Sequence, residues 1–138
     1  MNAYSWAILT ACIWGIVPIL EKLGLHKVDP FTALFYRCIG VLVGLFLLGT
    51  FVVKPAQLKA VDGRSMLFLV LSGFLASFVA QITFYHGLKI GEVSRVVPIS
   101  GTYPLVAFIL SFLILGEAFT LSRFAGITLI VTGAWLLR

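Results

Sequence analysis

Two residues of opposite charge lie close to the ends of long apolar segments, where ionic chemistry is unusual. Glu21 follows the uncharged run Met1–Leu20, and Arg37 lies shortly after the start of the next apolar segment. An arginine at the centre of a bilayer costs about 2.5–3.5 kcal/mol on insertion scales. Because each ion would offset the cost of burying the other, we predict a Glu21–Arg37 contact. Separate extension of both side chains to lipid headgroups is the alternative.

Tyr85 and His86 end a later apolar segment on the same side of the membrane as Glu21 and Arg37. We therefore assign all four residues to one gate or coupling group. His86 could exchange protons near neutral pH, and Glu21 could do so wherever Arg37 did not hold it ionised. An interfacial histidine without a proton role is the alternative for His86.

Polar and aromatic residues also recur at helical spacing inside three apolar segments. They are Trp14, Ser77, Gln81, Ser100 and Tyr103. At about 1.5 Å of rise per residue, Trp14 and Tyr103 both lie roughly 15 Å deep, near the bilayer centre. Polar residues in a membrane face protein or a water-filled cavity. We predict that these five side chains line a substrate pocket near the midplane; ordinary hydrogen bonding between helices is the alternative.

Five apolar segments must position these residues, and each is long enough to reach across a hydrocarbon core of about 30 Å. Because no water satisfies backbone groups there, the segments must be helices. We predict a single all-α transmembrane domain over residues 1–138. Its five helices are expected at about 4–23, 31–53, 65–88, 93–116 and 119–137. The loop from Lys54 to Arg64 is expected to hold a turn around Asp62-Gly63 and little else.

Small residues and prolines mark two of these predicted helices. Pro98, Gly101 and Pro104 interrupt the fourth helix and predict a hinge, with purely structural bending as the alternative. Gly126 and Gly133 lie seven residues apart on the fifth helix. Small residues at such spacing permit close approach of helices, so we predict packing between subunits at this face.

The basic residues are divided almost evenly between the two sides that five crossings would define. Four Lys and Arg residues fall on the side of the Lys54–Arg64 loop and five on the other side. An excess of Lys and Arg in short loops normally fixes orientation. The balance therefore predicts insertion in both orientations and antiparallel pairing, with a single orientation set by other features as the alternative.

Composition excludes several classes of function. A net charge of +5 would suggest nucleic acid as the partner of a soluble protein. Here the basic residues border apolar runs and would contact lipid headgroups, so we expect a lipid bilayer and no nucleic acid. No metal-ligand cluster, nucleophile–base pair or phosphate loop stands out in the sequence. We expect no enzyme, no metal and no cofactor.

The order and spacing of several motifs resemble the drug/metabolite transporter superfamily, in particular its EamA-type five-helix unit. The resemblance covers nearly the whole chain. It rests on Trp14-Gly15 with Lys22, Asp29-Pro30 with Arg37, Gly87-Leu88-Lys89, Pro98…Tyr103-Pro104…Leu115-Gly116-Glu117, and Gly126…Leu129-Ile130…Gly133. The small multidrug resistance relatives use a glutamate near the middle of the first helix for proton coupling. Trp14 occupies that depth here, and Glu21 lies nearer the helix end.

Most members of that family carry two inverted units in one chain, giving ten helices. The resemblance therefore implies that this single unit is half of a ten-helix inverted-repeat transporter, completed by antiparallel homodimerisation. It implies a secondary transporter, an exporter or exchanger of small metabolites, in a prokaryotic cytoplasmic membrane. A heteromer with a paralogous chain and a non-transporting accessory subunit are the alternatives.

Overall fold

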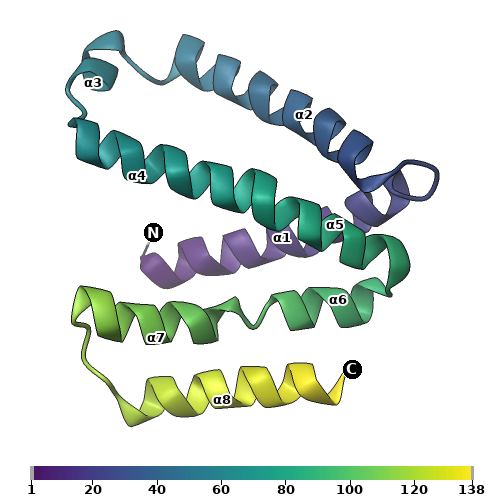
Figure 1. Ribbon diagram of the computed structural model, residues 1–138. Helices are drawn as coiled ribbons and strands as arrows, with labels where there is room; N and C mark the ends of the chain where they lie inside the picture. Colours follow the sequence, from purple (N-terminus) through teal and green to yellow (C-terminus); the bar gives the residue numbers. More distant parts are fainter. Residues whose placement is uncertain (1, 138) are drawn as a thin grey trace. The chain divides into compact units, whose positions relative to one another are not determined.

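The computed structural model describes residues 2–137, and every regular element in that range is helical (Figure 1). The elements are α1 (Ala3–Gly24), α2 (Pro30–Phe51), α3 (Pro55–Lys59), α4 (Gly63–Phe74), the π-helical segment η1 (Leu75–Val79), α5 (Ala80–Ile90), α6 (Val93–Ser100), α7 (Tyr103–Leu115) and α8 (Leu121–Leu136). The chain divides into two compact units. One is Glu21–Lys89, and the other combines Met1–Leu20 with Ile90–Arg138.

Four helical stretches in the described chain are long and apolar enough to cross a membrane. They are Ala3–Gly24, Pro30–Phe51, Gly63–Ile90 and Val93–Leu115. The predicted fifth crossing, residues 119–137, corresponds to α8, which has 16 residues and a length of about 24 Å. Most large apolar side chains on these helices are exposed to the surroundings of the chain, as expected of helices that contact lipid.

Two aspartates fix where helices of the unit Glu21–Lys89 begin. Asp29 precedes Pro30 and accepts hydrogen bonds from the backbone N–H groups of Phe31 and Thr32. Asp62 accepts one from the N–H of Ser65 at the start of α4. Such caps satisfy donors that the first helical turn leaves unpaired, so both helices begin immediately after an aspartate.

The loop between α2 and α4 contains more structure than the sequence suggested. Residues Pro55–Lys59 form the short helix α3, where only a turn around Asp62-Gly63 was expected. Pro55 suits a first helical position, because its missing N–H has no helical partner there. The side chain of Gln57 accepts a hydrogen bond from the N–H of Lys54 and closes the turn.

The helix predicted over residues 65–88 is not uniform. It runs from Gly63 to Ile90, but the segment Leu75–Val79 is π-helical and separates α4 from α5. A π turn inserts one extra residue and offsets the helix faces on its two sides. Ser77 lies inside this segment, whereas Gln81 and Tyr85 follow it on α5.

The fourth predicted helix, 93–116, is divided into α6 and α7. Gly101 and Thr102 form the break, and α7 resumes at Tyr103 with Pro104 in its first turn. A proline provides no N–H for the carbonyl four residues earlier, which explains why the helix stops between Pro98 and Pro104. In the same unit, α8 packs against both α6 and α7 (Figure 1).

One unit has a small buried core, and the other has a cluster of aromatic rings that is partly exposed. In Glu21–Lys89, the buried side chains are Leu25, Leu34, Tyr85 and Leu88, from the α1–α2 connection, α2 and α5. In the other unit, the ring of Phe119 contacts those of Phe108, Phe112 and Phe124 at centroid distances of 5.7, 6.5 and 5.7 Å. These contacts pack the α7–α8 connection against its helices.

Candidate functional site

Glu21 and Arg37 form an ion pair, as the sequence predicted. The distance from Arg37 Nε to Glu21 Oε1 is 3.4 Å, and the side chains are 30% and 10% exposed, respectively. Glu21 comes from the last turns of α1 and Arg37 from the second turn of α2. The pair therefore joins two span-length helices near the ends that the α1–α2 loop connects.

Two neutral side chains of α5 donate to the same carboxylate oxygen. Gln81 Nε2 lies 2.8 Å from Glu21 Oε1, and the hydroxyl of Tyr85 lies 3.0 Å from it. Their spacing of four residues places Gln81 and Tyr85 on one face of α5. Because Arg37 also reaches Oε1, side chains from α1, α2 and α5 meet at one oxygen atom.

The guanidinium of Arg37 is incompletely paired within the described chain. Its Nη1 atom is buried and has no hydrogen-bond partner among residues 2–137. Buried polar atoms normally have a partner, and leaving one unpaired typically costs about 1–3 kcal/mol. Arg37 Nη1 is therefore a buried donor atom that would gain a partner only in a different arrangement of the surrounding helices.

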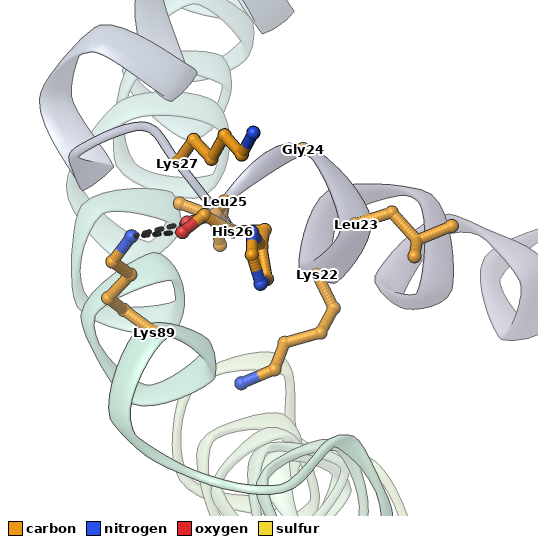
Figure 2. Close-up of a pocket in the computed structure, with 7 residues that line it drawn as sticks. All are labelled: Lys22, Leu23, Gly24, Leu25, His26, Lys27 and Lys89. Carbon is orange, nitrogen blue, oxygen red and sulfur yellow. Dashed lines mark hydrogen bonds between the residues drawn. The ribbon is translucent and has the colours of Figure 1, made fainter.

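Two lysines connect the α1–α2 loop to the end of α5 in a reciprocal way. Lys22 donates to the carbonyl of Leu88 on α5. Lys89 donates to the carbonyls of Leu25, His26 at 3.3 Å and Val28 at 2.9 Å; its bond to Leu25 is drawn in Figure 2. Carbonyls at a helix C-terminus lack helical partners and attract cations. Each lysine therefore caps the segment from which the other one extends.

These reciprocal contacts of Lys22 and Lys89 were not predicted from the sequence. The signal was present, because Lys22 and Lys89 both lie in the last turn of a helix, beside Gly24 and Ile90. Basic residues in a last turn favour contact with terminal carbonyls. Only the folded arrangement reveals that the carbonyls belong to the neighbouring segment.

His86 lies on α5 next to Tyr85 but does not contact Glu21 in the described contacts. Its Nδ1 is 2.9 Å from the carbonyl oxygen of Ile82, within the same helix. Its ring meets that of Phe31 edge-on, with centroids 5.4 Å apart. A coupling role for His86 thus stays a prediction.

The five residues predicted to line a midplane pocket are divided between the two units. Trp14 and Tyr103 are each 60% exposed, and the hydroxyl of Ser100 donates to the carbonyl of Val96 at 2.7 Å. These three belong to one unit, and Ser77 and Gln81 belong to the other. A common pocket therefore stays a prediction, and Gln81 is already engaged by Glu21.

No group of three or more His, Cys, Asp and Glu side chains within residues 2–137 is placed to hold a metal ion. The cluster around Glu21 consists of an ion pair and two hydrogen-bond donors between apolar helices. An all-helical chain with four span-length apolar helices is a membrane protein.

The chain belongs to the EamA-like transporter family, which matches residues 1–138. It is 28% identical over 132 residues to an uncharacterized transporter in the cobO 3' region of Sinorhizobium sp., covering 96% of this chain and 93% of that protein. It is also 28% identical over 135 residues to an uncharacterized transporter of Archaeoglobus fulgidus. That match covers 94% of this chain and 46% of the relative, so the chain spans less than half of that protein. No solved structure matches the chain.

The family and both relatives identify a membrane transporter rather than an enzyme. They also agree with the resemblance that the sequence motifs carry. A small-molecule substrate and a lipid bilayer are therefore the partners that family membership implies.

Proposed function

We propose that the chain is a secondary transporter, an exporter or exchanger of small metabolites, that works by alternating access in a prokaryotic cytoplasmic membrane. The observation that carries this proposal is the convergence of Arg37, Gln81 and Tyr85 on Glu21 Oε1. It ties three membrane helices together at one end without covalent or metal links. Rigid-body rocking around a fixed site is the usual motion of such transporters.

In this mechanism the Glu21 cluster is the gate at one membrane face. Closing it excludes water from the apolar helices while the side chains satisfy one another. Opening it separates α5 from α1 and α2, and the hydrogen bonds to Oε1 are replaced by bonds to water or substrate. The unpaired Nη1 of Arg37 supports this idea, because it keeps the closed state from being too stable to open.

Five residues remain our candidates for substrate binding: Trp14, Ser77, Gln81, Ser100 and Tyr103. The helix break at Gly101–Thr102 supports a hinge formed with Pro98 and Pro104, which would let α6 and α7 move separately. His86 is kept as a second coupling candidate beside Glu21.

We further propose that residues 1–138 form one five-helix domain and that two copies pair antiparallel into a ten-helix transporter. The near-equal division of basic residues supports this arrangement. So does the difference in length between the relatives, since the Archaeoglobus protein has room for a second unit of this size and the Sinorhizobium protein does not. The 16 residues of α8 would cross as the fifth helix with slight local thinning of the bilayer.

The topology is tested with one cysteine appended after Arg138 in a Cys12→Ala/Cys38→Ala background. A membrane-impermeant maleimide is applied to intact cells and to inverted vesicles. Antiparallel homodimers require labelling in both preparations. Labelling in only one of them would exclude this model and favour a heteromer with a paralogous chain.

Transport itself is tested by the release of amino acids and organic acids from cells that express the chain. Mass spectrometry of the medium compares the wild type with Trp14→Ala and Tyr103→Ala. A transporter loses release of its substrate in these variants. Two results together would favour an accessory subunit instead. Expression of the wild type would leave the metabolites of the medium unchanged, and a membrane protein that co-purifies with the chain would keep its own activity in the presence of either variant.

A further inference from the structure

We propose that the α1–α2 loop and the end of α5 form a binding site for a phosphate group, independent of the transport gate. The site is a cavity of about 520 Å³ lined by Lys22, Lys27, Lys89, His26 and the neighbouring loop residues (Figure 2). Pockets for small molecules typically measure about 300–1,000 Å³. The inference does not rest on the proposed transport function.

The lining carries three lysines and no acidic residue. The two carboxylates nearest in sequence are both committed to other partners. Glu21 forms an ion pair with Arg37 and accepts hydrogen bonds from Gln81 and Tyr85, and Asp29 accepts from the first N–H groups of α2. The charges of Lys27 and Lys89 are therefore not offset by these neighbouring acids, and an anion would relieve the repulsion between these two lysines.

The lining residues divide into fixed charges and available donors. Lys89 uses its three N–H donors on the carbonyls of Leu25, His26 and Val28, so it contributes a fixed charge rather than a bond. Lys22 is likewise held by the carbonyl of Leu88. The side chains of His26 and Lys27 are exposed and form no hydrogen bond or ion pair with residues 2–137. These two supply the donors that would bind the anion.

The position of the cavity indicates a phosphate group. Both span-length stretches that border it end here, at Gly24 and Ile90, and the ends of membrane spans lie near the phosphates of lipids. Lysine binds phosphate as a point charge, and basic pockets at the ends of membrane helices bind acidic lipid headgroups. The phosphate can come from the phosphodiester of an anionic phospholipid or from free inorganic phosphate.

The lipid arm of the test uses the purified chain in nanodiscs of phosphatidylcholine mixed with phosphatidylglycerol. Native mass spectrometry measures how much phosphatidylglycerol the protein retains. Lys27→Ala should reduce retention about fivefold, the effect of one basic residue near a charged membrane surface. His26→Ala should reduce it less. Lys59→Ala in α3 removes an exposed lysine outside the cavity and is the matched control; it should leave retention unchanged.

The second experiment titrates inorganic phosphate into the protein in nanodiscs of phosphatidylcholine alone, and calorimetry measures the heat of binding. Selective loss of phosphatidylglycerol in Lys27→Ala without heat from phosphate supports a lipid headgroup as the occupant. Phosphate binding that disappears in Lys27→Ala supports a soluble phosphate instead. Equal lipid retention in Lys27→Ala and Lys59→Ala, together with no phosphate binding, overturns the site.

Discussion

The hydroxyl of Tyr85 donates to Oε1 of Glu21 at 3.0 Å, and the tyrosine is only 3% exposed. A phenol buried among apolar helices needs a hydrogen-bond partner, and here the partner is itself an ion that needs donors. The contact therefore satisfies two polar groups at once. It also makes the position of α5 sensitive to anything that moves Glu21.

Tyr85→Phe should destabilise the protein by about 1.5–3 kcal/mol, because it removes one hydrogen bond to a charged group and leaves the ring in place. The loss is measured by thermal unfolding in detergent, followed by circular dichroism. Tyr36→Phe on α2 is the control, since Tyr36 is exposed, and it should change stability by less than about 0.5 kcal/mol. Equal effects of the two variants would mean that the Tyr85–Glu21 bond adds nothing to stability.

Glu21→Ala should cost more stability than Arg37→Ala. Removing the carboxylate leaves Arg37, Gln81 and Tyr85 without their common acceptor, whereas removing the guanidinium leaves the carboxylate with two donors. The double variant should give a coupling energy of about 1–2 kcal/mol, kept moderate by the 30% exposure of Arg37. The measurement is a double-mutant cycle on thermal or denaturant unfolding. Additive single-variant losses would contradict a direct Glu21–Arg37 interaction.

The sequence predicted the Glu21–Arg37 pair because two isolated charges at corresponding ends of apolar segments have few other ways to offset burial. Helical spacing alone puts Gln81 and Tyr85, four residues apart, on one face of a helix. It could not reveal that Glu21 binds both of them, since spacing along one helix does not say which neighbouring helix it faces. For the same reason the contact of Lys22 with α5 and that of Lys89 with the α1–α2 loop could not be predicted.

Helix positions followed from long uncharged runs, whereas the capping of α2 by Asp29 and of α4 by Asp62 was seen only in the structure. The interruptions were harder to predict. Pro98 and Pro104 indicated a bend, but the complete break at Gly101 and Thr102 depends on how the freed carbonyls are satisfied. The π segment Leu75–Val79 has no proline or glycine within it, so its sequence gives no local signal for the extra residue.

Gly101→Ala should lower both stability and transport. A Cβ at Gly101 would lie 3.2 Å from the carbonyl oxygens of Val97 and Pro98, so the backbone at the helix break must shift. Gly73→Ala on α4 is the control, because a Cβ there meets nothing within 4 Å. It should be neutral or stabilising by up to about 1 kcal/mol, as usual for glycine to alanine in a helix. The comparison uses thermal unfolding and metabolite release; equal behaviour of the two variants would remove Gly101 from the hinge.

The capping aspartates should make the protein less stable in acid. Hydrogen bonds from the side chain and backbone of Thr32 lower the pKa of Asp29, and those of Ser65 lower the pKa of Asp62. As the pH falls, the unfolded chain takes up these protons first. The stabilisation is therefore complete above the unfolded pKa of about 4 and is lost as the pH falls through the folded values.

Asp29→Asn/Asp62→Asn tests this origin of acid sensitivity. Asparagine is as good an N-cap as aspartate, so the double variant should retain its melting temperature near pH 7. It should lose less stability than the wild type when the pH falls below about 4. Melting temperatures across that range provide the measurement. If the melting temperature of the double variant fell in acid as steeply as that of the wild type, the acid sensitivity would come from other groups.

Substitutions at Gly126 and Gly133 test whether a second copy of the chain packs against α8. A Cβ at either glycine meets nothing within 4 Å in the described chain, so a larger side chain should not disturb the fold of one copy. Gly126→Ile and Gly133→Ile should therefore leave the melting temperature nearly unchanged while reducing the dimer fraction several-fold. The reason is that isoleucine would hold the backbones of two α8 helices apart. Mass photometry or crosslinking in detergent gives the dimer fraction.

Gly44→Ile on α2 provides the contrast, because Gly44 belongs to a Gly40…Gly44 pair that also has open space beside it. If the dimer depends on α8, this variant leaves the dimer fraction unchanged. Loss of the dimer in Gly44→Ile with no effect of Gly133→Ile would move the interface to α2. A dimer that tolerates all three substitutions would form without the glycine faces of α2 and α8, and two copies of the chain would then pair through another surface.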